Sequence, residues 1–556
     1  MSRIRFFALG GLGENGKNMY VVEVDQQLFI LDAGIKYPTS ELYGVDEIIP
    51  DYRILIRAKD RIKGIFLTHA HEDHIGALPH VLKELNVPVY ATHFTMQIVK
   101  DTLSDEGFDL ESLTLNTIHS NSIIKFGNVR LTFFGTTHSI PESIGIAIHT
   151  LDGVIVYTSD FTFDQSSDVH YMTDFRKINE LSEKNVLLLL SESVGSTLEG
   201  GHFGSTALNH RINSIYANAE GRIIVSLFSS DLRKIQRIID ISLAHNKKLA
   251  IIGRRAQRIV DIAIEKGYLT IPESALINLR YIDEKNKNDD PSIVALVTGN
   301  RHEPFFMLQR MVKKTDRLIH INENDTIILM TAPVPGTEKM AVRTLDTLYR
   351  SDADIKVIDK RLLTTGHATS DELKMMMNLL KPQYIVPTIG EFRHQYALRK
   401  LAYDIGYKPE HVFLMDNGDV LTFENKEPYV SKNDINVGEI LIDGTAVGDV
   451  NDFVMKDREL LAEDGVLIIV AHVNPKIKTI VGSVELVTKG FVYVKESQNV
   501  LDRVKEIFLE VSKKHLEGKY INWNDYKKDV RNEIGRYIYQ EIRRSPITIP
   551  VIISID

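Results

Sequence analysis

The chain contains no cysteine among its 556 residues. Disulfides and thiolate metal ligands are therefore excluded, so any metal must be held by histidine and carboxylate groups. The sequence also lacks the run of roughly 18 apolar residues that a membrane-spanning helix needs. Its first ten residues carry too short an apolar stretch for a signal peptide. We therefore expect a cytoplasmic protein without a membrane segment.

The chain also has no excess of basic residues, because its formal net charge is -9. This charge argues against a protein that coats nucleic acid nonspecifically, because counterion release rewards a basic surface. It leaves room for a nucleic-acid enzyme, whose channel can be basic while the exterior is acidic, and bound dications add further positive charge. The length exceeds what one hydrophobic core supports, so we expect two to four domains.

The hydrophobic pattern predicts several kinds of element along the chain. The first part resembles β-hairpins, with strands at 20–24 and 28–31. From residue 223 onward strands and helices alternate, which favours a parallel α/β unit. Other predicted elements are a strand at 65–68, a helix at 75–85, a helix at 370–380 that opens with a Thr369–Glu372 capping box, and a polar linker at 425–438.

Beyond residue 450 the pattern predicts a compact tail with strands at 466–470 and 490–494 and a helix from Val500. On that helix Leu501, Val504, Phe508 and Val511 form one apolar stripe, which is more typical of a core-facing side than of a binding face.

The strongest chemical signal is the segment His69-Ala70-His71-Glu72-Asp73-His74. It lies between the predicted strand at 65–68 and the predicted helix, where a loop can turn several side chains toward one centre. His69 and His71 can share one ion, and Asp73 and His74 then face a second ion beside it. These ligands suit Zn²⁺, or Mn²⁺ where oxygen ligands are more numerous. The alternative is a polar loop in which Asp73 only caps the helix.

Three further residues fit the same centre. His138 lies in a loop after the strand at 129–134, and Asp160 ends the strand that begins at Val154. Asp32 is placed to orient a ligand imidazole from behind. Taken singly, His138 is an ordinary loop residue and Asp160 or Asp32 an ordinary turn former. Their weight comes from belonging to one set.

The H-x-H-x-D-H pattern with the later His138 and Asp160 resembles the metallo-β-lactamase superfamily. The segment GGLGENGKNMY at 10–20 is similar to the opening of bacterial ribonuclease J. Further segments similar to that family follow in order: Thr298–Asn300, Glu303–Pro304, Pro333–Gly336, Glu338–Lys339, Thr365–His367, Asp371–Lys374, Gly390–Arg393 and Lys456–Gly465.

This resemblance implies an α/β fold. A metallo-β-lactamase αββα sandwich is interrupted by a β-CASP α/β domain, and a small α+β C-terminal domain that supports oligomers follows. We expect the sandwich over 1–205 and 350–425, the β-CASP domain over 206–349, a linker over 426–450 and the C-terminal domain over 451–556.

The resemblance also implies a chemistry. Two zinc ions activate a water that attacks an RNA phosphodiester, giving endonuclease and 5′-to-3′ exonuclease activity. The expected metal ligands are His69, His71 and His138 for the first ion and Asp73 and His74 for the second, with Asp160 bridging. Asp73 and His367 are the expected catalytic residues. The scissile phosphate is expected to contact Thr364, Thr365, Gly366 and His367.

The sequence departs from this family on one rim of the site. Catalytic members have a metal-binding His where this chain has Ile389, and another His where it has Leu363. Isoleucine cannot ligate, so the second ion loses one protein ligand. His302 and His394 are two candidate substitutes, but neither aligns with the missing ligand, so we expect no rescue by them.

We therefore predict a ribonuclease J-type RNA processing or decay protein that is weak alone. It resembles the second ribonuclease J paralogue found beside an active one in many Firmicutes. Expected partners are RNA, the active paralogue and further copies of this chain in a dimer or tetramer. Expected cofactors are two Zn²⁺, the second weakly bound, or Mn²⁺.

Three alternatives remain. The chain is a fully active nuclease with an altered second site, a hydrolase of another metallo-β-lactamase type such as a thioester hydrolase, or a binding-only scaffold. The long insertion and the C-terminal domain count against a simple hydrolase, and the intact motif at 69–74 counts against a scaffold.

Overall fold

The computed structural model describes residues 2–38, 42–164, 168–200, 204–279, 290–334, 337–360, 362–363, 366–424, 427–444, 446–447, 452–491, 498–518 and 520–555. Contacts divide the chain into two compact units. The larger unit comprises Met1–Tyr37 and Glu47–Ile440, and the smaller comprises Pro38–Asp46 and Leu441–Asp556. In the described part of the chain, no helix is both long and apolar enough to cross a membrane.

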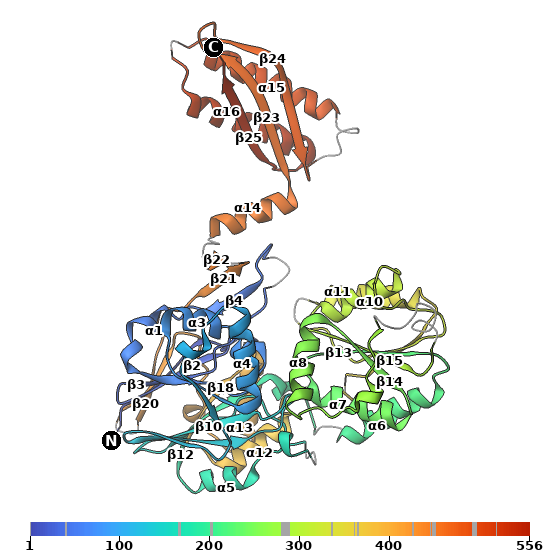
Figure 1. Cartoon of the computed structure of the whole chain (residues 1–556). Helices are drawn as coiled ribbons and strands as arrows, with labels where there is room; N and C mark the ends of the chain where they lie inside the picture. Colours follow the sequence, from blue (N-terminus) through green and yellow to red (C-terminus); the bar gives the residue numbers. More distant parts are fainter. Residues whose placement is uncertain are drawn as a thin grey trace. The chain divides into compact units, whose positions relative to one another are not determined.

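Two β-sheets form the centre of the larger unit (Figure 1). The eight-stranded sheet has the order β20 (Glu427–Ser431), β19 (Val420–Glu424), β1 (Ile4–Gly10), β2 (Met19–Val24), β3 (Gln27–Leu31), β5 (Ile62–Phe66), β6 (Val89–Thr92) and β7 (Leu115–Ile118). The six-stranded sheet has the order β18 (Tyr384–Thr388), β12 (Val186–Glu192), β11 (Val154–Tyr157), β10 (Ile144–His149), β9 (Val129–Gly135) and β8 (Ile123–Phe126).

One hydrophobic core lies between these sheets. It joins buried side chains of the first sheet, such as Phe29 and Phe66, to those of the second, such as Ile146 and Leu188. A second core covers the other face of the six-stranded sheet with α5 (Phe175–Ser182), α12 (Ser370–Leu380) and α13 (Phe392–Asp404). Helix α4 (His93–Asp105) packs on β6 and β7 of the first sheet. The expected αββα layering is confirmed.

The inserted domain contains a parallel five-stranded sheet (Figure 1). Its order is β14 (Lys248–Ile252), β15 (Ile293–Gly299), β13 (Ile223–Phe228), β16 (Thr326–Leu329) and β17 (Asp354–Val357). Its helices include α6 (Gly204–Asn218), α7 (Leu232–Ala244), α8 (Arg254–Glu265), α10 (Glu303–Val312) and α11 (Glu338–Tyr349). The predicted parallel α/β unit is confirmed, and its sheet extends past residue 349, where we placed the domain boundary.

Three element predictions need correction. The predicted linker at 425–438 contains β20, an edge strand of the eight-stranded sheet. Its polar side chains and Pro428 look like a linker because an edge strand buries only part of its surface. The helix expected at 75–85 is two helices, α2 (Glu72–Ile75) and α3 (Leu78–Leu85). A strand was expected at 490–494, but the strand in this region, β24 (Thr479–Lys489), ends one residue earlier. Residues 492–494 lie outside the described residues.

The smaller unit is an α+β fold. Strands β24, β23 (Val466–Asn474) and β25 (Ile547–Ser554) form one sheet, in that order. Helices α15 (Gln498–Leu516) and α16 (Trp523–Ile542) pack on one face of it around a core that contains Leu467, Phe508 and Tyr526. The predicted apolar stripe on α15 is buried, as expected for a core-facing side.

Candidate metal centre

The segment after β5 turns sharply into the short helix α2. His69 and His71 precede this helix, and Asp73 and His74 lie within it. His71 has an extended backbone and stands at the N-cap of α2. The Ala33 amide donates to the His74 carbonyl oxygen over 2.7 Å and thereby fastens this turn to the end of β3. A Cβ at Gly34 would lie 1.6 Å from the Asp73 carbonyl oxygen, so only glycine permits this approach.

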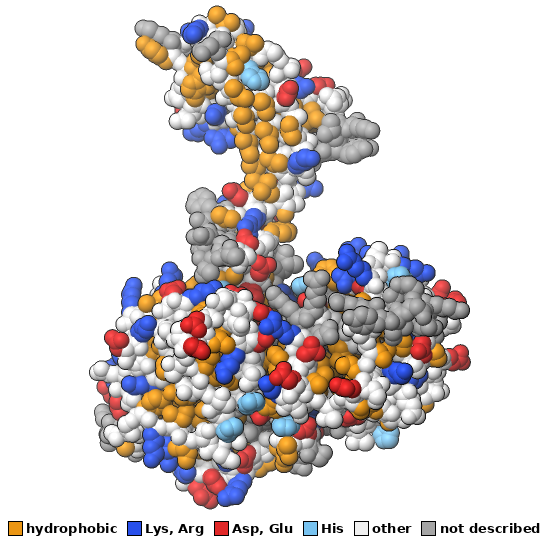
Figure 2. Space-filling view, in the orientation of Figure 1, with side chains coloured by type: hydrophobic (Ala, Val, Ile, Leu, Met, Phe, Trp, Pro, Cys, Tyr) orange, Lys and Arg blue, Asp and Glu red, His pale blue; other side chains and the backbone are white. Residues whose placement is uncertain are grey.

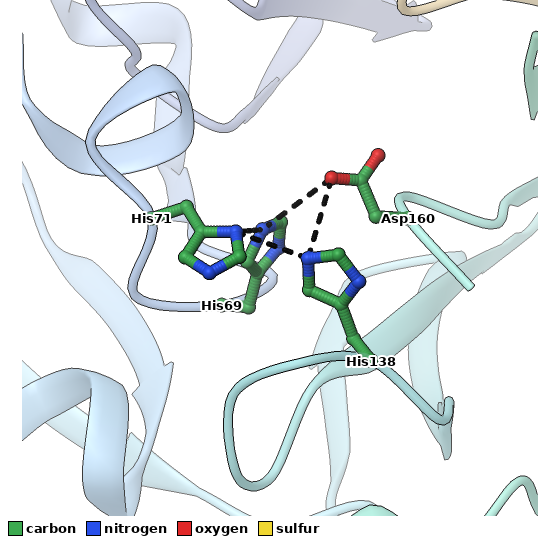
Figure 3. A group of neighbouring side chains, drawn as sticks. All are labelled: His69, His71, His138 and Asp160. Carbon is green, nitrogen blue, oxygen red and sulfur yellow. Dashed lines mark hydrogen bonds and ion pairs between the residues drawn. The ribbon is translucent and has the colours of Figure 1, made fainter. Parts of the chain in front are cut away.

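Three imidazoles and one carboxylate converge in a first group, drawn in Figure 3. Nδ1 of His71 is 3.1 Å from Nε2 of His69 and 3.0 Å from Nε2 of His138. Oδ2 of Asp160 is 3.6 Å from Nε2 of His69 and 3.6 Å from Nε2 of His138. The four side chains come from the ends of β5, β9 and β11, which the two sheets bring to one place.

The outer nitrogens of this group are fixed by hydrogen bonds. Nε2–H of His71 donates to the Ser230 carbonyl oxygen over 3.2 Å, and Nδ1–H of His138 donates to the Gly366 carbonyl oxygen over 2.7 Å. Each bond leaves the lone pair of the other ring nitrogen facing the centre, which is how metal-ligating histidines are oriented.

Burial keeps these imidazoles neutral. Loss of solvation lowers the pKa of His69, of His71 and of His138 below the ordinary histidine value. Neutral lone pairs facing one another repel, and Oδ1 of Asp160 is buried without a hydrogen-bond partner. A bound divalent cation would relieve both costs, so the residues present fit the metal that the fold implies.

A second group shares Asp160 with the first. Nε2 of His74 is 3.5 Å from Oδ2 of Asp73 and 3.5 Å from Oδ2 of Asp160. Behind it, Oδ2 of Asp32 accepts from Nδ1–H of His74 over 2.8 Å. Burial disfavours the charged imidazolium, but the carboxylates of Asp73, Asp32 and Asp160 outweigh it and raise the pKa of His74. Through its hydrogen bond to Nδ1–H, Asp32 is placed to orient the His74 ring with Nε2 toward Asp73 and Asp160.

His367 lies beside these groups and is held by a residue that sequence reasoning missed. Oε2 of Glu192 accepts from Nδ1–H of His367 over 2.8 Å, and Oε1 accepts from the Phe161 and Ala368 amides. Burial lowers the pKa of His367, but Asp160 and Glu192 outweigh this and raise it to about 9. Burial raises the pKa of Glu192 and the charge of His367 lowers it in part, so that it lies at about 7.

A signal for Glu192 was present in the sequence. The carboxylate ends the apolar strand β12, just as Asp160 closely follows the apolar strand β11 beside it in the same sheet. Parallel neighbours place their carboxyl ends at one edge of a sheet, so the two side chains were candidates for one site.

The rim predicted to be incomplete is apolar. Leu363 is 8% exposed and Ile389 is 2% exposed. Ile389 has φ +48°, a left-handed conformation that is rare for a β-branched side chain. Gly366 lies against His138 through its carbonyl oxygen. The predicted substrate contacts Thr364 and Thr365 lie outside the described residues.

The two histidines considered as substitutes lie elsewhere. His302 makes an edge-to-face contact with Phe306 at the start of α10, with ring centroids 5.2 Å apart. His394 lies in the first turn of α13 and accepts at Nε2 from Arg393 over 3.2 Å. Neither belongs to a metal-ligand group among the residues that were described.

A cationic pocket adjoins the first group. It is lined by His138, Ser139, Thr162, Asp231, Arg233, Lys234, Arg237 and Gly366. Arg233 pairs with Asp164 over 2.9 Å and Lys234 with Asp231 over 2.5 Å. Burial lowers the pKa of Arg237, and the charge of Arg233 adds to this. The inserted domain thus contributes positive charge next to His138.

Four family models match the chain in order. They are the metallo-beta-lactamase superfamily over residues 12–191, the ribonuclease J beta-CASP domain over 220–348, the Zn-dependent metallo-hydrolase RNA specificity domain over 355–415 and the ribonuclease J C-terminal domain over 453–555.

Relatives match over almost the full length. Proteins named Ribonuclease J 2 from Staphylococcus aureus strain NCTC 8325 and from Staphylococcus epidermidis strain RP62A are 38% identical over 552 residues, covering 99% of this chain and 98% of each relative. A crystal structure of a protein of unknown function from Enterococcus faecalis V583 aligns with a TM-score of 0.53 at 16% identity, covering 76% of this chain and 100% of that one. The chain belongs to the ribonuclease J family.

Proposed function

We propose that this protein is a metal-dependent ribonuclease with 5′-to-3′ exonuclease and endonuclease activity on RNA. The observation that carries the proposal is the convergence of His69, His71, His138 and Asp160, with Asp73 and His74 adjoining them through Asp160. Paired divalent cations, when bound, make water nucleophilic at neutral pH and offset the charge of a phosphodiester. The nitrogen-rich first group suits Zn²⁺, and Mn²⁺ is the alternative.

His367 and Glu192 supply positioning and a proton. Glu192 accepts from Nδ1–H of His367, so Nε2 is the nitrogen available to a phosphate oxygen. Asp160 and Glu192 raise the pKa of His367 and so favour its imidazolium, and its Nε2–H is the donor proposed for a scissile phosphate oxygen. Asp73 lies at the open side of the second group, with 41% of its side chain exposed, and is the proposed catalytic carboxylate there.

RNA is the proposed substrate because a cationic pocket lies beside the reacting centre. Arg233, Lys234 and Arg237 line it together with His138. Clustered cations favour polyanions even on a protein of net negative charge. We assign the scissile phosphate to His367 and to the preceding segment of Thr364, Thr365 and Gly366. The match to an RNA specificity domain over 355–415 supports this assignment.

Activity is proposed to be weak in the isolated chain. The second group contains only Asp73, His74 and Asp160, and Ile389 occupies the position of the family's further histidine. The protein then acts with an active ribonuclease J paralogue in a cytoplasmic complex. As part of this proposal we keep the domain boundaries at 205 and 450, and we move those at 349 and 425 past strands β17 and β20.

The C-terminal unit provides a surface for such assembly. We define its apolar sheet face as Val481, Val487, Ile549, Val551 and Ile553, which are 36% to 44% exposed. Register places Val487 and Ile549 on either side of Ile468, and Figure 2 shows hydrophobic side chains gathered there. Contiguous exposed apolar surface marks contact sites. Its proposed partners are further copies of this chain in a dimer or tetramer, or the paralogue.

Cleavage of 5′-monophosphorylated RNA tests the proposal. We expect slow, metal-dependent cleavage by the purified protein, which increases when the paralogue is added. His71→Ala removes the cleavage, whereas the matched His302→Ala, outside the ligand groups, leaves it unchanged. Fast cleavage by partner-free protein would favour the fully active alternative, and absent cleavage would favour a scaffold. Metal-independent cleavage would refute the metal centre as the source of the activity.

A further inference from the structure

One polar side chain beside the second ligand group has no part in the mechanism above. Asn18 is fully buried at the start of β2. Its amide Nδ2 lies 3.1 Å from Nε2 of His74 and 3.4 Å from Oδ2 of Asp73. The amide thus borders the same space as these two side chains.

The spacing of these atoms is that of ligands around one ion. Four ligands about 2.1 Å from a central zinc are about 3.4 Å from one another in a tetrahedron. Nε2 of His74 is 3.5 Å from Oδ2 of Asp73 and 3.5 Å from Oδ2 of Asp160. Together with the two distances to the Asn18 amide, 3.1 Å and 3.4 Å, four of the six distances in this set therefore match the edges of a coordination shell.

A half turn of the amide brings its oxygen to this position, and Tyr20 favours that turn. The phenol has one proton but faces two acceptors at 3.0 Å, the Gly11 carbonyl oxygen and Oδ1 of Asn18. It also accepts from the Ile389 amide over 3.1 Å. After the half turn, Tyr20 donates to Gly11 and accepts from Nδ2 of Asn18, so the phenol no longer faces two acceptors with one proton.

A cation decides between the two orientations. Without it, Nδ2 of Asn18 donates to the Asp73 carbonyl oxygen over 3.0 Å. The half turn replaces this bond by two facing oxygens, which repel. A divalent ion attracts both oxygens and offsets the repulsion, so metal binding and amide rotation are coupled.

Glycine at position 11, in the segment at 10–20, permits this arrangement of Asn18 and Tyr20. Gly11 has φ +91°, and a Cβ there would lie 2.6 Å from Oδ1 of Asn18 and 2.3 Å from the Tyr20 hydroxyl. Ile389 supports the same network through its backbone, since its amide also contacts the Gly11 carbonyl oxygen at 3.1 Å. The residue that replaces the family's ligand thus holds Asn18 in place.

We propose that the Asn18 amide oxygen is a ligand of the second metal ion and substitutes for the histidine absent at 389. This proposal rests on the two-metal function proposed above. The resulting set contains one nitrogen and three oxygens, from His74, Asn18, Asp73 and Asp160. Oxygen ligands favour harder ions, so the second site takes Mn²⁺ in preference to Zn²⁺.

Manganese binding to the full-length protein tests the proposal without an activity assay. Electron paramagnetic resonance of free Mn²⁺ counts the bound ions during titration. We expect two Mn²⁺ per chain in the natural protein. Asn18→Leu keeps the shape but removes the donor, and it should weaken the second ion about tenfold or more. Asn18→Asp adds a charged oxygen and should tighten it. The matched control Asn417→Ala, which removes hydrogen bonds to Leu12 and Glu14 of the same segment, should leave both ions unchanged.

Unchanged second-ion affinity in Asn18→Leu overturns the proposal. If Asp73→Ala loses the second ion while Asn18→Leu keeps it, Asn18 is no ligand and the two-metal function stands. If the natural protein holds one ion at saturation, the second site and its Asn18 ligand are both refuted. Should Asn18→Leu fail to fold by circular dichroism, Asn18→Asp decides, because an affinity equal to that of the natural protein refutes the proposal.

Discussion

The two sides of the metal centre differ in how completely they are built. On the side of His69, His71 and His138, the ligand atoms lie about 3 Å apart, and partners behind His71 and His138 fix the rings. On the side of Leu363 and Ile389, both side chains are apolar and buried, so neither can ligate a metal. The first side carries the ligand set of a metal centre, and the second is where we propose that its activity is limited.

The apolar side is also strained. Ile389 holds a left-handed backbone conformation that costs an ordinary residue about 1–2 kcal/mol. Histidine is enriched in that conformation relative to β-branched residues. A histidine at this position would therefore hold the same backbone conformation with less strain than isoleucine.

Removing the shared carboxylate should have the largest effect. Asp160→Ala takes one oxygen from both ligand groups, so we expect metal content below one ion per chain and RNA cleavage at background. Metal analysis by mass spectrometry and a cleavage assay measure this. Retention of two ions would show that Asp160 bridges nothing.

Restoring the lost side chains should make the two sides alike. Leu363→His with Ile389→His is expected to raise second-ion affinity and cleavage about 10–100-fold, by analogy with the loss seen when metal-site partners are removed. Leu363→Gln with Ile389→Leu is the control, because it adds no imidazole. An unchanged cleavage rate in the histidine variant would mean that weakness has another cause.

Removing the hydrogen bond that orients the His74 ring should weaken metal binding at the second ligand group only. Oδ2 of Asp32 orients His74, so Asp32→Asn is expected to lower second-ion affinity about tenfold and to leave the first ion unchanged. Isothermal titration with Mn²⁺ resolves the two steps. An equal loss at both sites would contradict the separation drawn above.

The smallest effect is expected where the inserted domain contacts the motif. Nδ2 of Asn300 donates to Oε1 of Glu72 over 2.7 Å. Asn300→Ala should cost about 1.5–3 kcal/mol, the range for a hydrogen bond to a charged group, and lower the thermal midpoint by a few degrees. Metal content should not change, and a loss of either ion would assign this contact to the centre itself.

The sequence predicted most of the fold because its signals are local. The Thr369–Glu372 capping box starts α12 as expected, and the apolar stripe on α15 is buried. The edge strand β20 was missed because few of its side chains are buried, and a polar segment with proline is typical of a linker.

The candidate site was predictable where its residues share one motif, and less so where distant segments meet. Glu192 and His367 are 175 positions apart, and no spacing links them. Asn18 lies 56 positions from His74, in a segment noted only for its resemblance to the opening of ribonuclease J. Contacts of this kind depend on the packing of two sheets, which periodicity does not specify.

The most direct test of the central claim is the metal-binding isotherm of full-length protein free of any paralogue. The account predicts two steps, with the first ion bound at least about tenfold more tightly than the second. Two ions bound with equal, high affinity would show that the replacement at Ile389 does not weaken the centre, and would contradict the account.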